Sequence, residues 1–492
     1  MRKRKLTPLI ILIFIITAAS VFLLITFITT GKLGFGDNAI VLQPGTITYD
    51  PSLSSAEKAK LQDILEGITV AKDVTISAEN LNTRPTAENA LIYDILVPVA
   101  DFYDPRDNVL TAELDSDNIK LISVRELTPD QKLLSVDGQY FLDTFDRGAQ
   151  FRTLIFTGDN PSEALTVVKS HLEPSPGKDT TLSLAQTGTT AISRAMLLKL
   201  AAIGGDGAYF AENIKDFLSK NDLTHISHEV SYTDNCPGGT NTTTLCSDWR
   251  TLESLKNIGT DIVELTGNHN NDYGFTPYLN TVAKYEELGW KTFGGGKDEE
   301  TAKTPLEIDQ KAAKITLIGI NQSTSTKANG QGASGSNPGA NIYDKELLKQ
   351  QIAEAKAAGR FVIVDVQYYE CQCYPDGYVE MPECDAPISG QEAFFKSIAD
   401  LGADMVIGTQ AHQPQTYELY HGKPIYYGLG NLFFDQTYWP GTTRGLILTH
   451  YFIDGKYVQT RLSPTVYDKT LQVKLMDSDS AKSFINRLNN AR

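Results

Sequence analysis

From about Thr181 onward, short apolar runs alternate with amphipathic segments, and this alternation limits the fold more than any other feature of the sequence. Runs such as 314–320 and 361–366 are rich in β-branched residues, which is typical of buried strands. Between and after them, 344–357 and 391–401 have the spacing of amphipathic helices. Strands that alternate with helices predict a layered α/β domain.

The remaining segments divide the chain further. Residues 46–172 contain a helical segment and several strand-like runs, and predict a small α/β domain of unknown role. The segment 173–178, which contains Pro and Gly, predicts an interdomain linker. The main domain then covers 181–470, and 478–492 predicts a terminal helix.

Residues 1–33 predict a basic cytoplasmic tip followed by a transmembrane helix. Residues 2–5 are all basic, and 9–28 are uncharged and apolar over a length that crosses a hydrocarbon core of about 30 Å. Because basic residues stay on the cytoplasmic side, we expect a single-pass protein whose bulk is extracytoplasmic. The alternative is a cleaved signal peptide with small residues at 18–20, but the apolar run continues beyond that point.

The net charge excludes nucleic acid as a partner. The chain carries a formal charge of −16, and the segment before Leu33 is basic, so the remainder is more acidic still. Nucleic-acid binding needs a dense basic surface that releases phosphate counterions. An anionic polymer would therefore have to be recognised at a local site.

The five cysteines form a close pair, Cys236 and Cys246, and a close trio, Cys371, Cys373 and Cys384. On a chain exposed to an oxidising space, disulfides are the default. We expect one bond between Cys236 and Cys246, and one that joins Cys384 to Cys371 or Cys373. A zinc site built from the trio is the alternative.

Residues 265–274 read LTGNHNNDYG and follow a short apolar run that is typical of a buried strand. Asn268 and His269 are therefore expected at the carboxyl end of a strand, where α/β proteins carry their active sites. An amide oxygen and an imidazole nitrogen suit a cation such as Mn, Fe or Zn. The alternative is a plain turn, because Asn, Asp and Gly cluster wherever the chain reverses.

Five polar blocks follow strands of the main domain. They are 188–194, 222–229, 265–274, 408–415 and 424–436. In this order they resemble the CapA-type capsule or poly-γ-glutamate synthesis proteins, over about 182–436. That family is similar in fold to the calcineurin-like metallophosphoesterases. The resemblance implies a four-layer α-β-β-α domain, in which two sheets pack face to face, with a metal site at the strand ends.

Four positions depart from the family pattern. Thr189 stands where the family has Asp, Ser227 where it has Asn, and Gln367 and Gln410 where it has His. A two-metal site needs carboxylates and several imidazoles to bind about four positive charges. These four side chains offer only neutral oxygens, so the resemblance implies at most one divalent metal, Mn, Fe or Zn, or none.

The residues that do match define the candidate site. The resemblance implies His269, His412, Glu229 and Asn268 as metal ligands, and Glu229, His269 and Arg194 as catalytic, with Arg194 holding an anionic group. His228, beside Glu229, is a substitute ligand. Without a metal, the cleft is a binding pocket, and the substrate-binding residues are then Gln367, Gln410, Asn431 and Thr189.

Three functions are compatible with these features. The first is a membrane-anchored, extracytoplasmic protein for synthesis or export of a capsule or envelope polymer of the poly-γ-glutamate type. Its partners are the cell membrane and the polymer or its synthesis machinery. The second is a metal-dependent hydrolase of an envelope phosphoester or amide. The third is a non-catalytic polymer-binding module.

Overall fold

The computed structural model describes residues 45–114, 116, 118–234, 236–239, 242–323, 329–368 and 382–492, together with a short pair of strands, β1 (Lys32–Leu33) and β2 (Ile40–Val41). The predicted membrane segment 9–28 lies outside the described residues. Among the helices within those ranges, none is both long and apolar enough to cross a membrane. The chain forms two compact units, Met1–Leu96 with Ala149–Ser175, and Val97–Gly148 with Pro176–Arg492.

The first unit is a sheet with two helices. Its strand order is β3 (Ile47–Tyr49), β4 (Val74–Leu81), β10 (Gln150–Gly158) and the first part of β5 (Ala90–Asp101). The helices α2 (Ser55–Ile64) and α4 (Ser162–His171) bury apolar residues, such as Leu61 and Val168, together with Ile76 and Leu154 of the sheet. Ser54 caps α2, because its hydroxyl accepts the Glu57 N–H while the Glu57 carboxylate accepts the Ser54 N–H.

The second unit is built on two sheets. The first has the order β14 (Lys291–Phe293), β13 (Thr260–Glu264), β12 (Leu223–His228), β11 (Thr181–Thr190), β24 (Arg444–Ile453), β25 (Lys456–Val466) and β26 (Lys474–Leu475), with β23 (Asn431–Phe433) also paired to β11. The second has the order β16 (Leu306–Gln310), β17 (Ala313–Asn321), β19 (Phe361–Gln367), β20 (Met405–Thr409), β22 (Lys423–Tyr426) and β21 (Tyr417–Tyr420).

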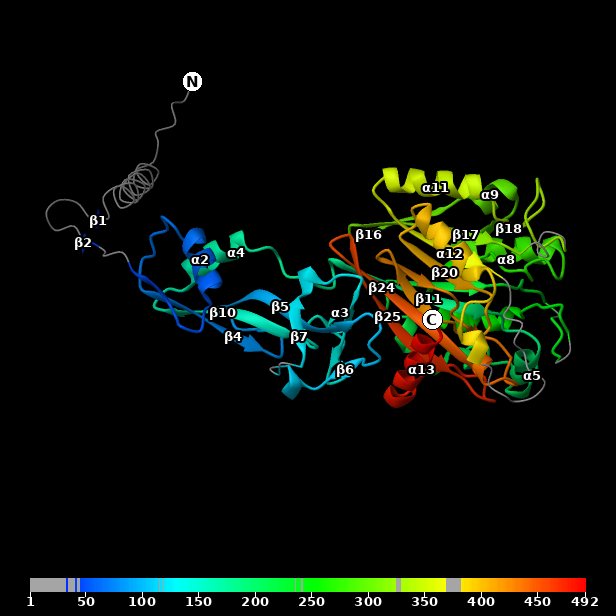
Figure 1. Ribbon diagram of the computed structural model, residues 1–492, viewed down its shortest axis with the longest axis horizontal. Helices are drawn as coiled ribbons and strands as arrows, with labels where there is room; N and C mark the ends of the chain where they lie inside the picture. Colours follow the sequence, from blue (N-terminus) through cyan, green and yellow to red (C-terminus); the bar gives the residue numbers. More distant parts are fainter. Residues whose placement is uncertain are drawn as a thin grey trace, which may run out of the picture. The chain divides into compact units, whose positions relative to one another are not determined.

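Apolar side chains divide this unit into four layers (Figure 1). Leu184 and Ile262 of the first sheet pack against Leu317 and Ile363 of the second. The outer face of the first sheet is covered by α5 (Ala195–Ala202), α7 (Leu252–Asn257) and α8 (Phe275–Glu287). The outer face of the second is covered by α11 (Lys345–Ala357) and α12 (Gln391–Asp400). The predicted layered α/β architecture is therefore confirmed for this unit.

The remaining elements are short. They are β6 (Asn108–Val109), β7 (Lys120–Ser123), β8 (Gln131–Leu133), β9 (Ser135–Val136), α3 (Phe141–Thr144), α6 (Lys215–Leu218), β15 (Gly295–Gly296), α9 (Glu299–Lys303) and β18 (Gly339–Ala340).

The division into units differs from the predicted ranges. Residues 97–148 fall in the second unit, not in the predicted domain 46–172, because they bond to its β-sheet. The Leu133 N–H donates to Gln459 Oε1 at 3.2 Å, and Asp143 pairs with Arg461 at 2.8 Å. The predicted terminal helix is α13 (Ser478–Asn490), whose Phe484, Ile485 and Leu488 join the core between the sheets.

Short sequence signals determine where two of the helices begin. The segment predicted from 344 to 357 is α11, with Asp344 as its cap, because the carboxylate accepts the N–H groups of Glu346 and Leu347. Helix α8 begins at Phe275. Gly274 precedes it with a φ of 86°, a backbone conformation that glycine adopts readily.

Polar side chains also lie between the two sheets. Asp365 accepts a hydrogen bond from Gln186 at 2.7 Å, and its Oδ2 lies 3.2 Å from His225 Nε2. Burial, with the nearby Asp365 carboxylate, raises the pKa of Glu264 from 4.5 to about 8. Glu264 therefore holds a proton at neutral pH in the folded protein, and its Oε1 accepts hydrogen bonds from the N–H and hydroxyl of Thr266.

The substitution Glu264→Gln is expected to reduce the pH dependence of stability. Because the folded pKa of about 8 exceeds the ordinary 4.5, the native protein loses stability as pH rises through that window. The slope reaches at most about 1.4 kcal/mol per pH unit for one group. Glutamine stays neutral and keeps the acceptor for Thr266, so the variant gains relative stability toward alkaline pH.

Thermal unfolding followed by circular dichroism from pH 5 to pH 9 checks this expectation. The matched control is Glu253→Gln on α7, whose side chain is 52% exposed. Parallel curves for the native protein and Glu264→Gln would show that Glu264 is not protonated in the folded state.

Candidate functional site

The polar blocks meet where strands of both sheets end. β11, β12 and β13 are parallel neighbours, and so are β19 and β20, so their carboxyl ends lie at common edges. Thr189 pairs with Ser227 and with Asn431, which brings three blocks side by side. Gln367 Nε2 donates to Asn268 Oδ1 at 3.3 Å, which joins the end of the second sheet to the block 265–274 that follows the first.

Two glycines allow this close approach. A Cβ atom on Gly188 would lie 2.0 Å from the carbonyl oxygen of Gly430, and one on Gly267 would lie 2.4 Å from Cβ of Glu229. No other residue fits either position without moving the backbone. Gly267 thereby places Asn268 and His269 directly against Glu229, whose side chain is buried.

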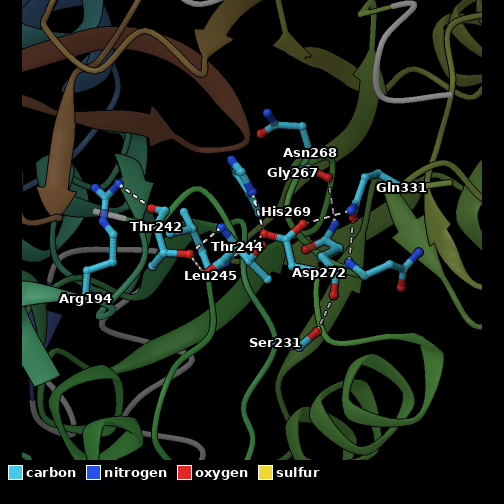
Figure 2. Close-up of polar contacts among 12 residues, drawn as sticks. Arg194, Ser231, Thr242, Thr244, Leu245, Gly267, Asn268, His269, Asp272 and Gln331 are labelled. Atoms are coloured by element: carbon cyan, nitrogen blue, oxygen red, sulfur yellow. Dashed lines mark hydrogen bonds and ion pairs between the residues drawn. The ribbon is translucent and has the colours of Figure 1, made fainter. Parts of the chain in front are cut away.

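His269 is held by a carboxylate. Its Nδ1 lies 2.7 Å from Asp272 Oδ2, and the same oxygen accepts the Leu245 N–H at 2.7 Å (Figure 2). Gln331 Nε2 donates to the other oxygen, Oδ1, at 2.9 Å. A carboxylate on Nδ1 fixes the ring and makes Nε2 the nitrogen that exchanges a proton or binds a ligand.

The neighbouring asparagines build the turn that carries His269. Asn270 Nδ2 donates to the carbonyls of Leu265 and Gly267 at 2.8 and 3.0 Å. The Asn271 N–H donates to Gln331 Oε1 at 2.6 Å, and its Nδ2 donates to the Pro338 carbonyl at 2.9 Å. The block is therefore both a turn and a support for an oriented histidine, since different residues perform the two tasks.

His412 is held in the corresponding way by an amide. Its Nδ1 lies 2.8 Å from Asn431 Oδ1, while Asn431 Nδ2 donates to the Thr442 carbonyl at 3.0 Å. The second bond fixes which end of the amide faces the ring, so Nδ1 is the donor and Nε2 is the acceptor nitrogen. The ring of Phe434 packs against the imidazole with 4.6 Å between centroids.

The residues predicted to bind substrate are buried. Gln367 and Gln410 are 1% and 3% exposed, and Gln367 Nε2 donates to Gln410 Oε1. Thr409 donates its hydroxyl to Gln367 Oε1 at 3.0 Å. Thr189 and Asn431 are each 1% exposed. The geometry therefore gives Asn431 a positioning contact with His412, and a direct contact of these four residues with substrate stays a prediction.

Arg194 is paired with a carboxylate. Its Nε lies 3.1 Å from Asp435 Oδ1, Nη2 donates to the same oxygen, and the guanidinium stacks 5.0 Å from the Phe434 ring centroid. The Ala195 N–H donates to Asp435 Oδ2 at 2.9 Å. An anionic group at Arg194 would meet a cation whose charge Asp435 already balances, and the anion-holding role stays a prediction.

His228 does not join the site, in contrast to the expectation of a substitute ligand. Its Nδ1 lies 2.9 Å from the Tyr285 hydroxyl, and its ring stacks on Tyr232 at 5.3 Å. Burial lowers the pKa of His228 to about 3. It faces the helices that cover the first sheet because alternate residues of a strand point to opposite sides, so Glu229 and His228 cannot face the same way.

The predicted metal ligands are His269, His412, Glu229 and Asn268. Two oriented imidazoles and Glu229 are of the type that a single Mn, Fe or Zn accepts. Within the described ranges, however, no three His, Cys, Asp or Glu side chains come together in a way that could hold an ion. These residues do not fit a complete metal site, and the predicted roles of Glu229 and Asn268 as ligands stay predictions.

Asp272, which holds His269, belongs to the predicted block 265–274. Two further contacts of the site were not anticipated. Leu245 acts through its backbone, which no side-chain motif reveals. Gln331 lies in the Ser-, Gly- and Asn-rich segment 322–339. It is 8% exposed, and its side chain bonds to Asp272 and to the Asn271 N–H.

The predicted disulfide between Cys236 and Cys246 is confirmed. Cys384 is disulfide-bonded as well, whereas the expected partners Cys371 and Cys373 lie outside the described residues.

Comparisons with known proteins agree with this arrangement. Residues 183–436, slightly more than half of the chain, match the family described as "Bacterial capsule synthesis protein PGA_cap". The chain is 26% identical to the capsule biosynthesis protein CapA of Bacillus anthracis over 42% of its own length and 47% of that protein's. It is 25% identical to the PGA biosynthesis protein CapA of Bacillus subtilis over 54% of its length and 66% of that protein's. The chain thus spans about half to two thirds of these relatives.

A solved structure, the NAD nucleotidase of Haemophilus influenzae, aligns with a TM-score of 0.33 and 13% identity over 63% of this chain and 62% of that one. A likeness this weak carries no argument about fold or function. The family match rests instead on the residues that contain all five blocks and both oriented histidines. The chain belongs to the bacterial capsule synthesis protein family PGA_cap.

Proposed function

We propose that this protein is a membrane-anchored, extracytoplasmic component in the synthesis or export of an envelope polymer of the poly-γ-glutamate type. Two relatives are named for capsule and PGA biosynthesis, which supports the choice of polymer. The apolar segment 9–28 with its basic flank supports the anchor, and the Cys236–Cys246 bond supports an oxidising location.

The observation that carries the proposal is the paired orientation of His269 and His412. Each ring is fixed through Nδ1, by Asp272 in one case and by Asn431 in the other. With Nδ1 held in this way, Nε2 is the nitrogen of each ring that is suited to bind a ligand. A turn or a packed core does not need a separate polar partner for each of two imidazoles.

The charge balance around these rings suits an anionic polymer. The protein carries −16 overall, which repels a polyanion at long range, so binding depends on local contacts. At the site, Asp435 is neutralised by Arg194, and the neighbouring Gln367 and Gln410 are uncharged amides. A polyglutamate chain repeats carboxylates and amides. Side-chain amides can donate to its carboxylates, and the imidazole Nε2 atoms can accept from its amide N–H groups.

A second candidate function is hydrolysis of an envelope phosphoester or amide with one bound metal. It is favoured by the carboxylate on Nδ1 of His269, because metal-bound histidines usually donate their other nitrogen to such a group. Within the described ranges, no three His, Cys, Asp or Glu side chains are placed to hold an ion, which makes this function the second candidate.

Polymer binding is expected to depend on both histidines. His269→Ala and His412→Ala should each weaken the binding of poly-γ-glutamate to the full-length, detergent-solubilised protein by about tenfold, equivalent to about 1.4 kcal/mol. Isothermal titration calorimetry measures the change. The control is His171→Ala, an exposed histidine at the end of α4 in the first unit. Unchanged affinity in both variants would refute polymer recognition at this site.

Metal content separates the second candidate from the first. The hydrolase requires about one equivalent of metal per chain, since a single ion would activate the attacking water. Mass spectrometry of the metal in the full-length protein, purified without chelator and then offered Mn or Zn, measures it. Metal that is lost in both His269→Ala and His412→Ala supports the hydrolase. A native protein that takes up no ion excludes it.

The anchor is tested by fractionation. We expect the full chain to sediment with bacterial membranes, to be digested by protease added to intact spheroplasts, and to become soluble when 2–28 are deleted, because an apolar span of this length inserts stably. The mass of the mature protein distinguishes the alternative, since a cleaved signal peptide would remove about the first 20 residues. A full-length chain found in the soluble fraction would contradict the proposal.

A further inference from the structure

The disulfide between Cys236 and Cys246 closes a loop beside the candidate site. The two Cα atoms are 5.7 Å apart, and we refer to the enclosed segment as the 236–246 loop. Its sequence, CPGGTNTTTLC, contains two glycines and mostly small polar residues. Leu245 is its one large apolar residue. Most residues of such a sequence have little apolar side-chain surface to bury, and a disulfide limits the conformations open to it.

One contact of the loop reaches His269. The Leu245 N–H donates to Asp272 Oδ2 at 2.7 Å, and this oxygen is the one that meets His269 Nδ1 (Figure 2). The loop and the imidazole therefore share a single acceptor atom. Gln331 holds only the other oxygen of Asp272, so the direction of Oδ2 depends on the loop.

A second contact reaches the surroundings of His412. The Leu245 side chain is 3% exposed and packs with Ala191, Val230 and Phe434. Phe434 is also the ring that lies 4.6 Å from the imidazole of His412. Leu245 thus supports one histidine through its backbone and the other through its side chain.

The loop also secures Arg194, the residue that precedes α5. The Gly239 N–H donates to the Arg194 carbonyl at 3.3 Å, and Arg194 Nη1 donates to the Thr242 carbonyl at 3.4 Å (Figure 2). Inside the loop, the Thr244 N–H donates to Thr242 Oγ1 at 3.0 Å. Arg194 therefore contacts the loop directly, whereas His269 and His412 are linked to it through Asp272 and Phe434.

We propose that the Cys236–Cys246 disulfide is a positioning element of the site. By holding the 236–246 loop closed, it places Leu245 where its N–H fixes Asp272 and its side chain supports Phe434, and it thereby sets the two imidazoles. This goes beyond the proposed polymer function, because it concerns how the histidines are held and applies to whatever they bind. A disulfide that only stabilised the fold would not change the histidines of a folded variant.

The test compares Cys236→Ser/Cys246→Ser with the native full-length protein labelled with nitrogen-15 in histidine. We expect the Leu245 amide to exchange with deuterium about tenfold faster or more, as local opening becomes easier. The separate Nδ1 and Nε2 signals of His269 should move toward each other as the ring loses its fixed tautomer. Unchanged signals of His269 and His412 in the folded double variant would overturn the proposal.

The single variant Leu245→Ala provides a second measurement if the double variant folds poorly. It keeps the backbone N–H that reaches Asp272 and removes the side chain that packs on Phe434. The signals of His412 should therefore shift while those of His269 stay in place. The control is Leu348→Ala, a buried leucine of α11 on the far side of the second sheet. Equal changes in this control would assign the effect to lost stability and overturn the proposal.

These outcomes are independent of the polymer. Loss of polymer binding in the His variants, with no effect of the disulfide on the histidine signals, would refute the positioning role alone. Histidine signals that depend on the disulfide, in a protein that binds no polymer, would refute the proposed function alone.

Discussion

The packing of two sheets through Leu184, Ile262, Leu317 and Ile363 is the constraint on which the site depends. In a single sheet, the loops at the strand ends would contact only loops of the same sheet. Packed face to face, they bring Gln367 at the end of β19 within 3.3 Å of Asn268 after β13. Residues about a hundred positions apart in the sequence thus become neighbours because apolar side chains in the middle of the domain hold the strand ends together.

The charges at and below the site are largely compensated. Arg194 pairs with Asp435, and Glu264 keeps its proton because burial makes its charged form costly. Thr189, Gln367 and Gln410 extend this pattern, since they are neutral where the resemblance led us to expect ionisable residues. The site therefore consists largely of uncharged hydrogen-bond donors and acceptors with fixed orientations. His269 and its Asp272 partner form its most polar part.

Much of the fold was predictable, because hydrophobic periodicity is a local property that survives in the sequence. The strand at 361–366 and the helix after Asp344 are examples. The block 265–274 also identified His269, because its neighbours in the chain carry the signal. The supports of the site were not predictable. Gln331 lies 59 residues from Asp272, and Leu245 acts through a backbone N–H that every residue except proline possesses. The assignment of 97–148 to the second unit depends on tertiary contacts, such as Leu133 with Gln459, for the same reason.

The disulfide between Cys236 and Cys246 adds a chemical step to the maturation of the protein. Strand pairing and sheet packing proceed as soon as the chain is long enough, and they need no chemistry beyond hydrogen bonding and burial. The bond between the two sulfur atoms forms only when an oxidant takes up two electrons, which makes it a separate chemical step. If this bond sets the imidazoles, the maturation of the protein has an oxidative step as well as a folding step. A chain whose sheets are in place then gains its positioned histidines only in oxidising surroundings.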